Sequence, residues 1–294
     1  MHPVILRNSI AGRGAGRIVV DALVSCLRDG GHDPILLDVN ISARRDERLV
    51  SALQQASVLI IAGGDGTVHH AAPLAIEADV PLIHFPMGTE NLFAREFGLK
   101  RSPRAVLEAI RRATLRRVDV GQCNGRTFLL MGSIGFDACV VERVAASRRG
   151  GISRATYLRH SAAELYRPRF VRMSVRVDGR ELVCGRAGMV LVANSRHYAG
   201  RLNPARNANM SDGALDVIFL PMESRIDVVR RGMQVLLGSQ LHDRANLHAQ
   251  GSEVTIIPET AAPLQLDGEH AGVQPVGQEL RFAVQPGALS VFTP

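Results

Sequence analysis

The sequence predicts an α/β protein of two domains, an N-terminal doubly wound domain on a parallel sheet and a C-terminal antiparallel β-sandwich domain. Over the first 120 residues, short β-branched runs alternate with segments of helical periodicity, which is typical of βα units. Beyond that point, short alternating runs follow one another with turns between them. The 294 residues suffice for both domains. We expect one domain over residues 1–119, completed by 286–294, and the other over 120–285.

Four apolar runs predict the parallel sheet. They are residues 4–7, 34–38, 58–62 and 81–84. Between the first two, residues 20–27 carry apolar side chains at helical spacing, and Gly30-Gly31 ends this helix. A second helix is predicted to begin at Ser102-Pro103, with serine as N-cap and proline in the first turn.

The second half contains more strands than helices. Strands are predicted over residues 170–177, 188–193, 215–220, 254–257 and 264–267. Helices are predicted over 140–147 and 157–165. Because turns separate most of these strands, we expect an antiparallel arrangement.

Composition excludes several classes of protein. The longest apolar runs are far shorter than the roughly 18 residues that span a bilayer, and the N-terminus lacks an apolar signal segment, so we expect a cytoplasmic protein. The four cysteines are widely separated, which argues against a zinc cage or a disulfide framework. Among 35 basic residues, Lys100 alone is lysine, and its position fits neither a Walker A loop nor a protein-kinase strand.

Three loops follow predicted parallel strands, where ligands bind in open sheets of this kind. The strongest signal is the loop formed by Gly63, Gly64, Asp65, Gly66 and Thr67. Its glycines allow close backbone approach, and a helix predicted to start at Thr67 would attract anions to its N-terminus. A carboxylate beside phosphates requires a bridging cation or a role in proton transfer. This loop therefore predicts a site for a metal-bound nucleotide.

The other two loops extend the predicted site. The segment after the fourth strand offers Gly88 for close approach, the hydroxyl of Thr89 and the amide of Asn91. The loop after the first strand contains three glycines, but its spacing is not that of a dinucleotide fingerprint. In that loop we favour Asn8 and Gly12 as phosphate or nucleoside contacts.

Two Asp-Gly segments in the second half suggest further chemistry, although each is also a common hairpin turn. Asp212, with nearby carbonyl groups, offers the hard oxygen ligands that Mg²⁺ prefers. Asp267 and Glu269 would point to the same side of an extended chain, as a base and its orienting partner.

Together these motifs resemble the bacterial diacylglycerol kinase catalytic family, which is similar to sphingosine and ceramide kinases. The matching segments are residues 63–67, 86–91, 133–138, 193–217 and 266–269. The resemblance implies a nucleotide domain, a β-sandwich domain and an active site between them. It also implies transfer of the ATP γ-phosphoryl group to the hydroxyl of a lipid such as diacylglycerol or a sphingoid base.

The resemblance also implies roles for individual residues. ATP would be held by the loop from Asn8 to Gly12, by Gly64 to Thr67 and by Thr89. To these contacts our own interpretation of the loops adds Gly63, Gly88 and Asn91. A structural Mg²⁺ would be held by the carbonyl groups of Asn209 and Ala214 and by the carboxylate of Asp212. Glu269, with Asp267, would accept the proton of the lipid hydroxyl, and Asp65 would organise the metal and the phosphates.

The chain departs from the family pattern in two places, which bears on its nucleotide preference. Val68-His69-His70 stands where Leu-Asn-Glu is usual, and Asn8-Ser9 stands where Asn-Pro is usual. Two other functions therefore stay open: a kinase of a soluble alcohol or of NAD, and a binding module without turnover. Phosphotransfer assays across these acceptors would separate them.

The excess positive charge is concentrated between Arg143 and Arg172, where eight arginines accompany one acid, Glu164. Such a surface fits anionic lipid headgroups, and we expect peripheral contact with the inner membrane face, with a solvated helical face as the alternative. Nucleic-acid binding is not expected, because the window lacks regularly interleaved aromatic residues. The sequence leaves open whether the protein is a homodimer.

Overall fold

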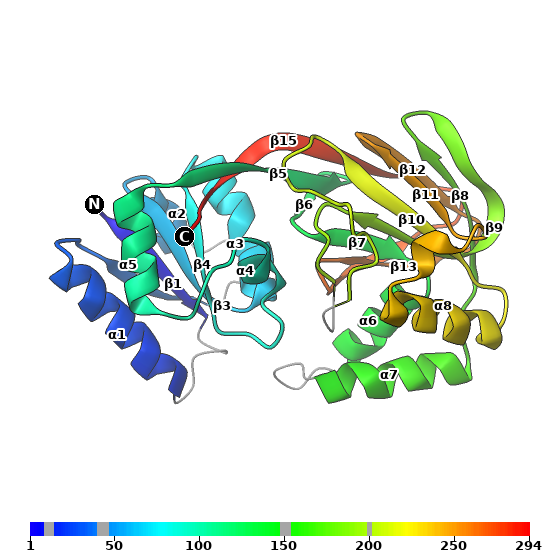
Figure 1. Ribbon diagram of the computed structural model, residues 1–294, viewed down its shortest axis with the longest axis horizontal. Helices are drawn as coiled ribbons and strands as arrows, with labels where there is room; N and C mark the ends of the chain where they lie inside the picture. The colour runs from blue at the N-terminus through cyan, green and yellow to red at the C-terminus, as the bar shows by residue number, and fades with distance from the viewer. Residues whose placement is uncertain (9–14, 40–46, 148–153, 199–201) are drawn as a thin grey trace. The chain divides into compact units, whose positions relative to one another are not determined.

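A computed structural model describes residues 1–8, 15–39, 47–147, 154–198 and 202–294 (Figure 1). These residues form two compact units. Unit 1 consists of Met1–Val118 and Gly287–Pro294, and unit 2 consists of Asp119–Pro286. The predicted change from parallel to antiparallel pairing is confirmed, because the strands pair in parallel in unit 1 and antiparallel in unit 2.

The sheet of unit 1 has the strand order β15-β4-β3-β1-β2. Its strands are β1 (Pro3–Asn8), β2 (Ile35–Val39), β3 (Val58–Gly63), β4 (Leu82–Pro86) and the end of β15 (Leu280–Phe292). Because β1 lies between β2 and β3, the winding direction changes there, and the carboxyl ends of β1 and β3 border the crevice where such sheets bind ligands.

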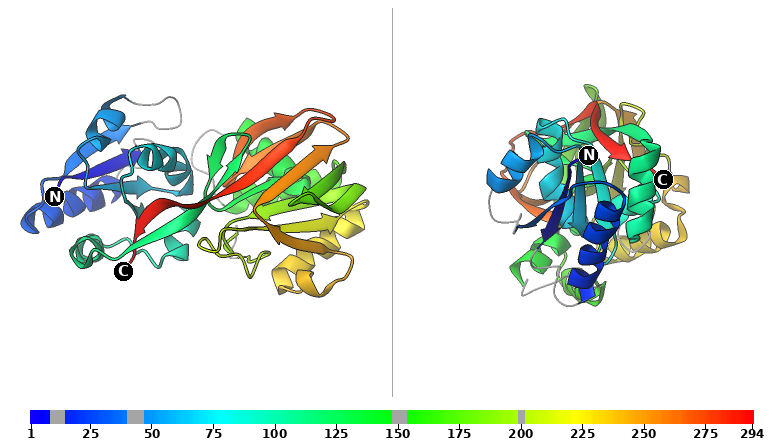
Figure 2. Two further views of the ribbon diagram at one scale, coloured as in Figure 1. Left: turned by 90° about the horizontal axis from the view of Figure 1, so that it is seen from above. Right: turned by 90° about the vertical axis from the view of Figure 1, so that its left-hand side faces the viewer.

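Helices cover both faces of this sheet. They are α1 (Ala15–Asp29), α2 (Glu47–Leu53), α3 (Asp65–Glu77), α4 (Leu92–Glu96) and α5 (Pro103–Arg112). Ile5, Ile60 and Ile83 pack with the apolar residues of α1 and α5, which lie side by side (Figure 2). Leu59 and Ile61, which point to the opposite face, are also fully buried. Both faces are therefore apolar, as expected for a parallel sheet between helices.

Unit 2 is built from antiparallel strands. They are the end of β5 (Leu115–Cys123), β6 (Arg126–Phe128), β7 (Met131–Ile134), β8 (Val171–Val177), β9 (Arg180–Ala193), β10 (Leu215–Pro221), β11 (Leu247–Gly251), β12 (Glu253–Pro258), β13 (Ala262–Leu266), β14 (Glu269–Gln274) and the start of β15. Their inward residues form one core that includes Phe128, Phe219 and Phe282.

In the described part of unit 2, helical segments accompany these strands. They are α6 (Phe136–Ala146), α7 (Arg154–Tyr166), α8 (Arg225–Leu237) and the short 3₁₀ helix η2 (Gln240–His242). The two helices predicted before residue 170 are confirmed as α6 and α7, and each is longer than predicted. Among the described residues, no helix combines the length and the apolar character needed to cross a membrane.

Two predicted boundaries are wrong in a way that matters for the site. The helix after the first glycine loop begins at Asp65, two residues before Thr67, so Asp65 lies in its first turn. The strand predicted over 264–267 ends at Leu266, because Asp267 adopts a left-handed backbone conformation with φ of 52°. Asp267 therefore belongs to a turn.

Candidate active site

The backbone of the first glycine loop is held from β4. The carbonyl oxygen of Gly63 accepts hydrogen bonds from the N–H of Met87 at 2.8 Å and from Nε2 of His84 at 2.9 Å. In a trans peptide the following N–H points away from the carbonyl. The N–H of Gly64 is therefore directed away from β4, at the start of α3.

His84 is nearly fully buried, with 1% of its surface exposed. Burial holds the pKa of His84 below its ordinary value, although the Asp65 carboxylate and the Gly63 carbonyl act in the opposite direction. The ring is therefore neutral at pH 7, and Nε2 carries the proton because its partner can only accept. Sequence reasoning missed this residue, since it occupies an apolar position of a predicted strand.

The second glycine loop packs directly on the first. A Cβ atom built on Gly88 would lie 2.6 Å from the Cα of Gly64, and one built on Gly64 would lie 3.1 Å from the Cα of Gly88. A carbon atom at 2.6 Å overlaps its neighbour severely. The backbones of the two loops are thus in direct contact, and this contact is possible only with glycine at position 88.

Asn91 closes the second loop on itself. Its Oδ1 accepts the N–H of Gly88 and its Nδ2 donates to the carbonyl of Gly88, both at 2.8 Å. Asn91 also has φ of 50°, a left-handed conformation that asparagine tolerates better than most residues. Its amide therefore shapes the loop, and Gly88 and Thr89 form the exposed part.

Asp65 connects the N-terminal ends of two helices. It lies in the first turn of α3, and its Oδ1 accepts the N–H of Phe93 in α4 at 3.1 Å. Within the described residues, no side chain caps α3 at Gly64. Phosphate groups bind favourably to such helix N-termini, because N–H groups and the helix dipole face them.

In the loop that follows β1, Asn8 lies within the described residues and Gly12 lies outside them. Nδ2 of Asn8 donates to Oγ1 of Thr67 at 3.1 Å, which brings two of the predicted nucleotide contacts together. Asp38, the penultimate residue of β2, pairs with the Arg7 guanidinium through both carboxylate oxygens. That pair lowers the pKa of Asp38 and occupies the carboxylate that a dinucleotide site would use for ribose.

In unit 2, Asp267 and Gly268 form the turn between β13 and β14, both with positive φ. The carboxylate of Asp267 accepts the backbone N–H groups of Leu129 at 2.8 Å, Leu130 at 2.7 Å and Met131 at 3.1 Å. The extended geometry assumed for residues 267–269 is therefore absent. Asp267 holds the turn in place, and Glu269 begins β14 directly after it.

A polar network lies under this turn. Nε2 of Gln265 donates to Oγ of Ser133 at 3.0 Å and to Oδ2 of Asp137 at 3.2 Å, and its Oε1 accepts the N–H of Gly268 at 2.8 Å. Burial raises the pKa of Asp137, although hydrogen bonds from Tyr198, Ser133 and Gln265 oppose this. Sequence reasoning noted the segment that contains Asp137 but assigned it no role.

The predicted metal ligands lie on one loop of unit 2. Asp212 accepts the N–H of Ala214 at 3.1 Å and the amide of Gln250 at 2.9 Å, and the carbonyl of Asn209 accepts the N–H of Ser211 at 2.8 Å. Among the described residues, no group of three or more His, Cys, Asp or Glu side chains could hold a metal. A site here would therefore depend on carbonyl oxygens and water besides Asp212, a donor set that suits Mg²⁺.

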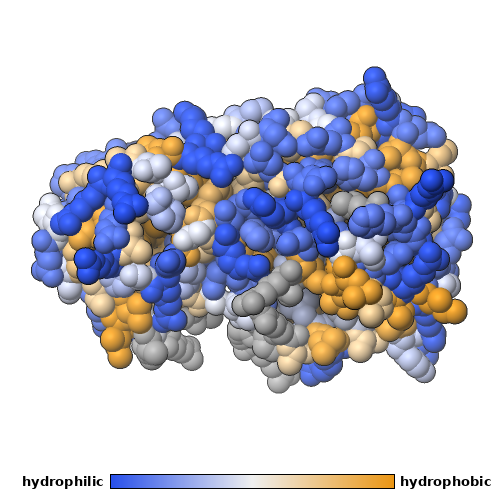
Figure 3. Space-filling view, viewed as in Figure 1, coloured by the Kyte–Doolittle hydropathy of each residue, from blue (hydrophilic) through white to orange (hydrophobic). Residues whose placement is uncertain are grey.

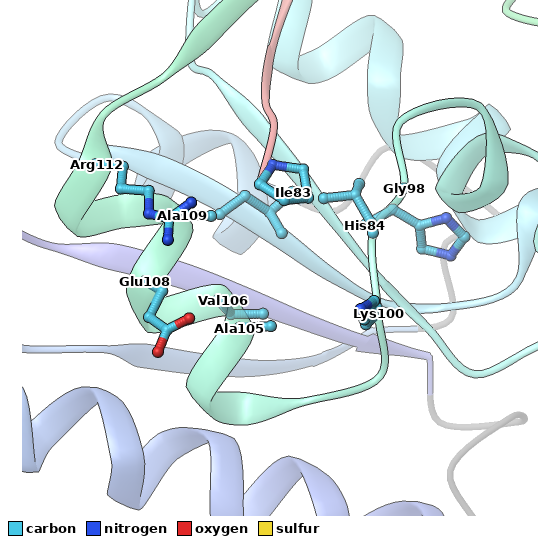
Figure 4. Close-up of a pocket in the computed structure, with 11 residues that line it drawn as sticks. Ile83, His84, Gly98, Lys100, Ala105, Val106, Glu108, Ala109 and Arg112 are labelled. Atoms are coloured by element: carbon cyan, nitrogen blue, oxygen red, sulfur yellow. The ribbon is translucent and has the colours of Figure 1, made fainter.

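A separate pocket in unit 1 lies between β4, residues 98–100 and α5 (Figure 4). Lys100 lies on one side of it, and Glu108 and Arg112 of α5 lie on the other. None of the site residues predicted from the sequence lines this pocket. The pocket adjoins the first glycine loop through His84, which lines the pocket and bonds to the Gly63 carbonyl.

Of the residues predicted to bind nucleotide, those that the structure describes fall at one edge of the unit 1 sheet, at or after the ends of β1, β3 and β4. The predicted base and metal ligands fall in unit 2. Glycine loops before a helix N-terminus, at the carboxyl edge of a parallel sheet, are typical of proteins that bind phosphate groups.

Two family models cover the chain. Residues 2–123 match the diacylglycerol kinase catalytic domain, and residues 131–293 match the YegS C-terminal NAD kinase beta sandwich-like domain. The protein is thus a phosphotransferase of the lipid kinase type. It belongs to the diacylglycerol kinase catalytic family, as the sequence motifs predict, and its second unit has the β-sandwich class that the sequence predicts.

Relatives in several bacteria match most of the chain. A Pseudomonas aeruginosa protein named "Probable lipid kinase YegS-like" is 30% identical and is matched over 96% of this chain and 92% of its own length. A Mycobacterium tuberculosis diacylglycerol kinase is 29% identical over 80% of this chain and 78% of its own. A Bacillus subtilis diacylglycerol kinase is 26% identical over 76% and 75%.

Solved structures share the fold. A diacylglycerol kinase from Bacillus anthracis matches with a TM-score of 0.70 at 17% identity, over 100% of this chain and 96% of that one. Yeast NADH kinase in complex with NADH matches with a TM-score of 0.55 at 11% identity, over 99% and 82%. The architecture is therefore common to enzymes that phosphorylate different acceptors.

Proposed function

We propose that the protein transfers the γ-phosphoryl group of ATP to the hydroxyl of a lipid such as diacylglycerol or a sphingoid base, in a Mg²⁺-dependent reaction. The observation that carries this proposal is the backbone contact between Gly64 and Gly88 beside the first turn of α3. Because no side chain separates the two loops, a phosphate group can approach the N-terminus of α3 at close range. Relatives named as lipid and diacylglycerol kinases support the lipid acceptor.

In this proposal, unit 1 holds the nucleotide. The contacts are Asn8, Gly12, Gly63, Gly64, Asp65, Gly66, Thr67, Gly88, Thr89 and Asn91. His84 supports this role indirectly, because its hydrogen bond to the Gly63 carbonyl orients the N–H of Gly64. The chain lacks a Walker-type lysine, so the helix N-terminus must supply part of the charge stabilisation.

Unit 2 supplies the proton acceptor. Glu269 would take the proton of the attacking hydroxyl, which phosphoryl transfer requires from a positioned base. Asp267 is tied to three backbone N–H groups, so its part is to fix the turn from which Glu269 projects.

Bound Mg²⁺ would neutralise phosphate charge, and a second, structural Mg²⁺ would sit on the loop of Asn209, Asp212 and Ala214. The oxygen donors of that loop fit a hard cation, because Asp212 is exposed and its carboxylate oxygens can accept more than the two hydrogen bonds described. Asp65 lies at the helix N-terminus where the phosphates would bind, so its carboxylate is placed to face a metal-bound nucleotide.

The test is a phosphotransfer assay with ATP and Mg²⁺ on diacylglycerol, a sphingoid base, a water-soluble alcohol and NAD. We expect a phosphorylated lipid, and we expect Glu269→Gln to lower kcat by about 10²- to 10⁴-fold with nucleotide binding unchanged. Glu253→Gln is the matched control, because Glu253 also begins a strand of unit 2 and is exposed. Product from NAD or the soluble alcohol alone would overturn the lipid assignment, and unchanged kcat in Glu269→Gln would remove Glu269 from the reaction.

A further inference from the structure

The outward face of α8 is apolar. Its exposed large hydrophobic residues are Ile226, Val229, Met233, Leu236 and Leu237, and Ile226 and Leu237 are 78% and 73% exposed. At about 100° per residue, these five positions span roughly 100° of the helix surface. They therefore form one continuous stripe that faces solvent.

The inward face of the same helix carries charge. Arg231, which is 3% exposed, bonds to the carbonyl of Pro221 and to the carboxylate of Asp243 at 2.7 Å, and Gln234 donates to the same carboxylate. A surface helix of a soluble domain normally has the opposite arrangement, with the apolar stripe facing the core. The apolar stripe of α8 therefore does not serve to pack this helix against the core.

Helix α7, which contacts α8, repeats this inversion. Its Glu164 is fully buried and pairs with Arg143 and Arg169, whereas Leu158 and Tyr166 are strongly exposed. The ring of Tyr166 lies 5.6 Å from the guanidinium of Arg225 at the start of α8. Figure 3 shows hydrophobic surface over both helices at the lower right. We refer to the exposed apolar residues of α7 and α8 as the α7–α8 face.

Arginines border the apolar stripe of α8. Arg225 and Arg230 are exposed and lie about 70° from its centre line, one on each side. Arg230 also donates to the carboxylate of Asp243 at 2.8 Å, which it shares with Arg231, so the two arginines together keep a net positive charge. Arginine in such a position keeps its charge in water while its stem covers apolar surface. Apolar side chains between basic edges are complementary to a bilayer that has anionic headgroups above acyl chains.

We propose that the α7–α8 face inserts into the interface of an anionic lipid bilayer and docks the protein there. This differs from attraction of the arginine-rich segment alone, because the apolar residues of α8 enter the acyl boundary. The inference rests on the proposed function in one respect, since a lipid kinase must meet an acceptor that resides in a membrane.

The fold links this face to the predicted base. Tyr157, on the same helix as Leu158, donates its hydroxyl to the carbonyl of Gly268 at 3.3 Å. Gly268 directly precedes Glu269 in the turn between β13 and β14. A helix is about 10 Å across, so a bilayer on the outer face of α7 lies about one helix diameter from that turn. Docking through this face brings membrane lipid to the side of unit 2 that carries Glu269.

The experiment uses the natural absence of tryptophan from this chain. Val229→Trp places a fluorophore in the stripe, and Ile18→Trp places a matched one on the exposed side of α1. Vesicles of phosphatidylcholine with phosphatidylglycerol, with and without brominated acyl chains, are added without ATP. We expect a blue shift and bromine quenching for Val229→Trp and neither for Ile18→Trp. Equal responses, or none, would overturn the proposal.

Binding strength gives a second measurement. The double variant Leu236→Gln with Leu237→Gln should lower the vesicle partition coefficient at least about tenfold. Transfer of one leucine side chain from water into the bilayer is by itself expected to raise that coefficient more than about tenfold. Arg225→Gln should weaken binding roughly fivefold, and added salt should reduce this difference. The control Val276→Gln changes an exposed valine outside the α7–α8 face and should have no effect.

Two further outcomes separate the alternatives. If the face instead joins two copies of the chain, sedimentation without lipid will show an oligomer that the double glutamine variant disrupts, and the proposal fails. Activity on a short-chain acceptor below its aggregation concentration should be the same in that variant and in the wild type. Loss of vesicle binding with this activity retained supports docking, whereas vesicle binding without phosphorylation of any acceptor would refute the proposed function and leave docking supported.

Discussion

Replacing Gly88 with alanine tests whether the two glycine loops must touch. The new Cβ would lie 2.6 Å from the Cα of Gly64 and 3.0 Å from Oδ1 of Asn91. The Cα of Gly64 is a backbone atom, so it cannot relieve the clash by a rotamer change as the end of a flexible side chain could. Since Gly88 does not have a positive φ, the effect is steric and involves no intrinsic backbone strain.

The magnitude follows from the overlap. Carbon atoms in contact lie about 3.5 to 4.0 Å apart, so the loops must separate by roughly 1 Å. A displacement of about 1 Å of groups that position a substrate can lower catalysis about 100-fold. Overpacking of this kind also costs about 1–3 kcal/mol of folding free energy. Gly64→Ala creates a contact of 3.1 Å and should have a smaller effect.

The assay is turnover of a short-chain acceptor together with ATP binding measured by calorimetry. The expected result is a kcat/KM lowered about 100-fold for Gly88→Ala, less for Gly64→Ala, and unchanged for Gly232→Ala. Gly232 lies within α8, where an added Cβ would have open space beyond the helix's own backbone, and alanine there should stabilise the helix by about 1 kcal/mol. A Gly88→Ala variant with wild-type kcat/KM would refute the role of the loop contact.

Three further predictions concern charge and hydrogen bonding. Asp65→Asn keeps the acceptor for the Phe93 N–H but removes the charge, so kcat should fall at least about 100-fold with unchanged thermal unfolding; retained turnover would remove the Asp65 charge from the reaction. Asp267→Asn turns an amide N–H₂ toward at least one backbone N–H, so urea unfolding should show a loss of about 1–3 kcal/mol; wild-type stability would contradict the turn-fixing role. Because the pKa of His84 is lowered, its contribution to stability is present above about pH 6.5 and is lost as pH falls below it, with a slope of at most about 1.4 kcal/mol per pH unit. His84→Leu should flatten the stability profile between pH 7 and 5, and an unchanged slope would show that other histidines cause it.

The parallel half of the fold could be predicted because its signals are local. Residues 58–62 form an apolar run of strand length, and the glycines of residues 63–67 mark the turn that follows it. Ser102 caps α5 as predicted, with its hydroxyl accepting the N–H of Ala105 at 3.3 Å. Such features depend on neighbours in the chain, so one sequence is enough to find them.

The features that sequence reasoning missed depend on distant contacts. An Asp-Gly pair predicts a turn, but the carboxylate of Asp267 meets Leu129, Leu130 and Met131, which lie about 137 positions earlier in the chain. His84 has the period of an apolar strand residue, and its partner is the carbonyl of Gly63 on the neighbouring strand. Neither pairing leaves a pattern in a single sequence.

Helix α8 was missed for a different reason. Periodicity is read on the assumption that the apolar stripe of a helix faces the core, but in α8 the stripe faces outward and Arg231 is buried. The signals that could have identified the helix are Ser224 with Asp227, which form a capping box, and Gly238, which ends it with φ of 67°. A search for helix-capping residues, made before the search for apolar periodicity, would have found the helix.

The two units hold their loops by different means, and this makes the proposed roles separable by experiment. In unit 1, Gly64 and Gly88 meet through backbone atoms, so side-chain growth should impair turnover more than folding. In unit 2, side chains such as Asp267 and Gln265 fasten the turn before Glu269, so their loss leaves backbone N–H groups unsatisfied and should impair folding as well. A variant of unit 2 that loses turnover is therefore informative about Glu269 only when its stability is measured alongside. The Glu269→Gln variant should therefore be assayed for turnover and for urea unfolding together, and only a loss of turnover at wild-type stability assigns the proton-accepting role to Glu269.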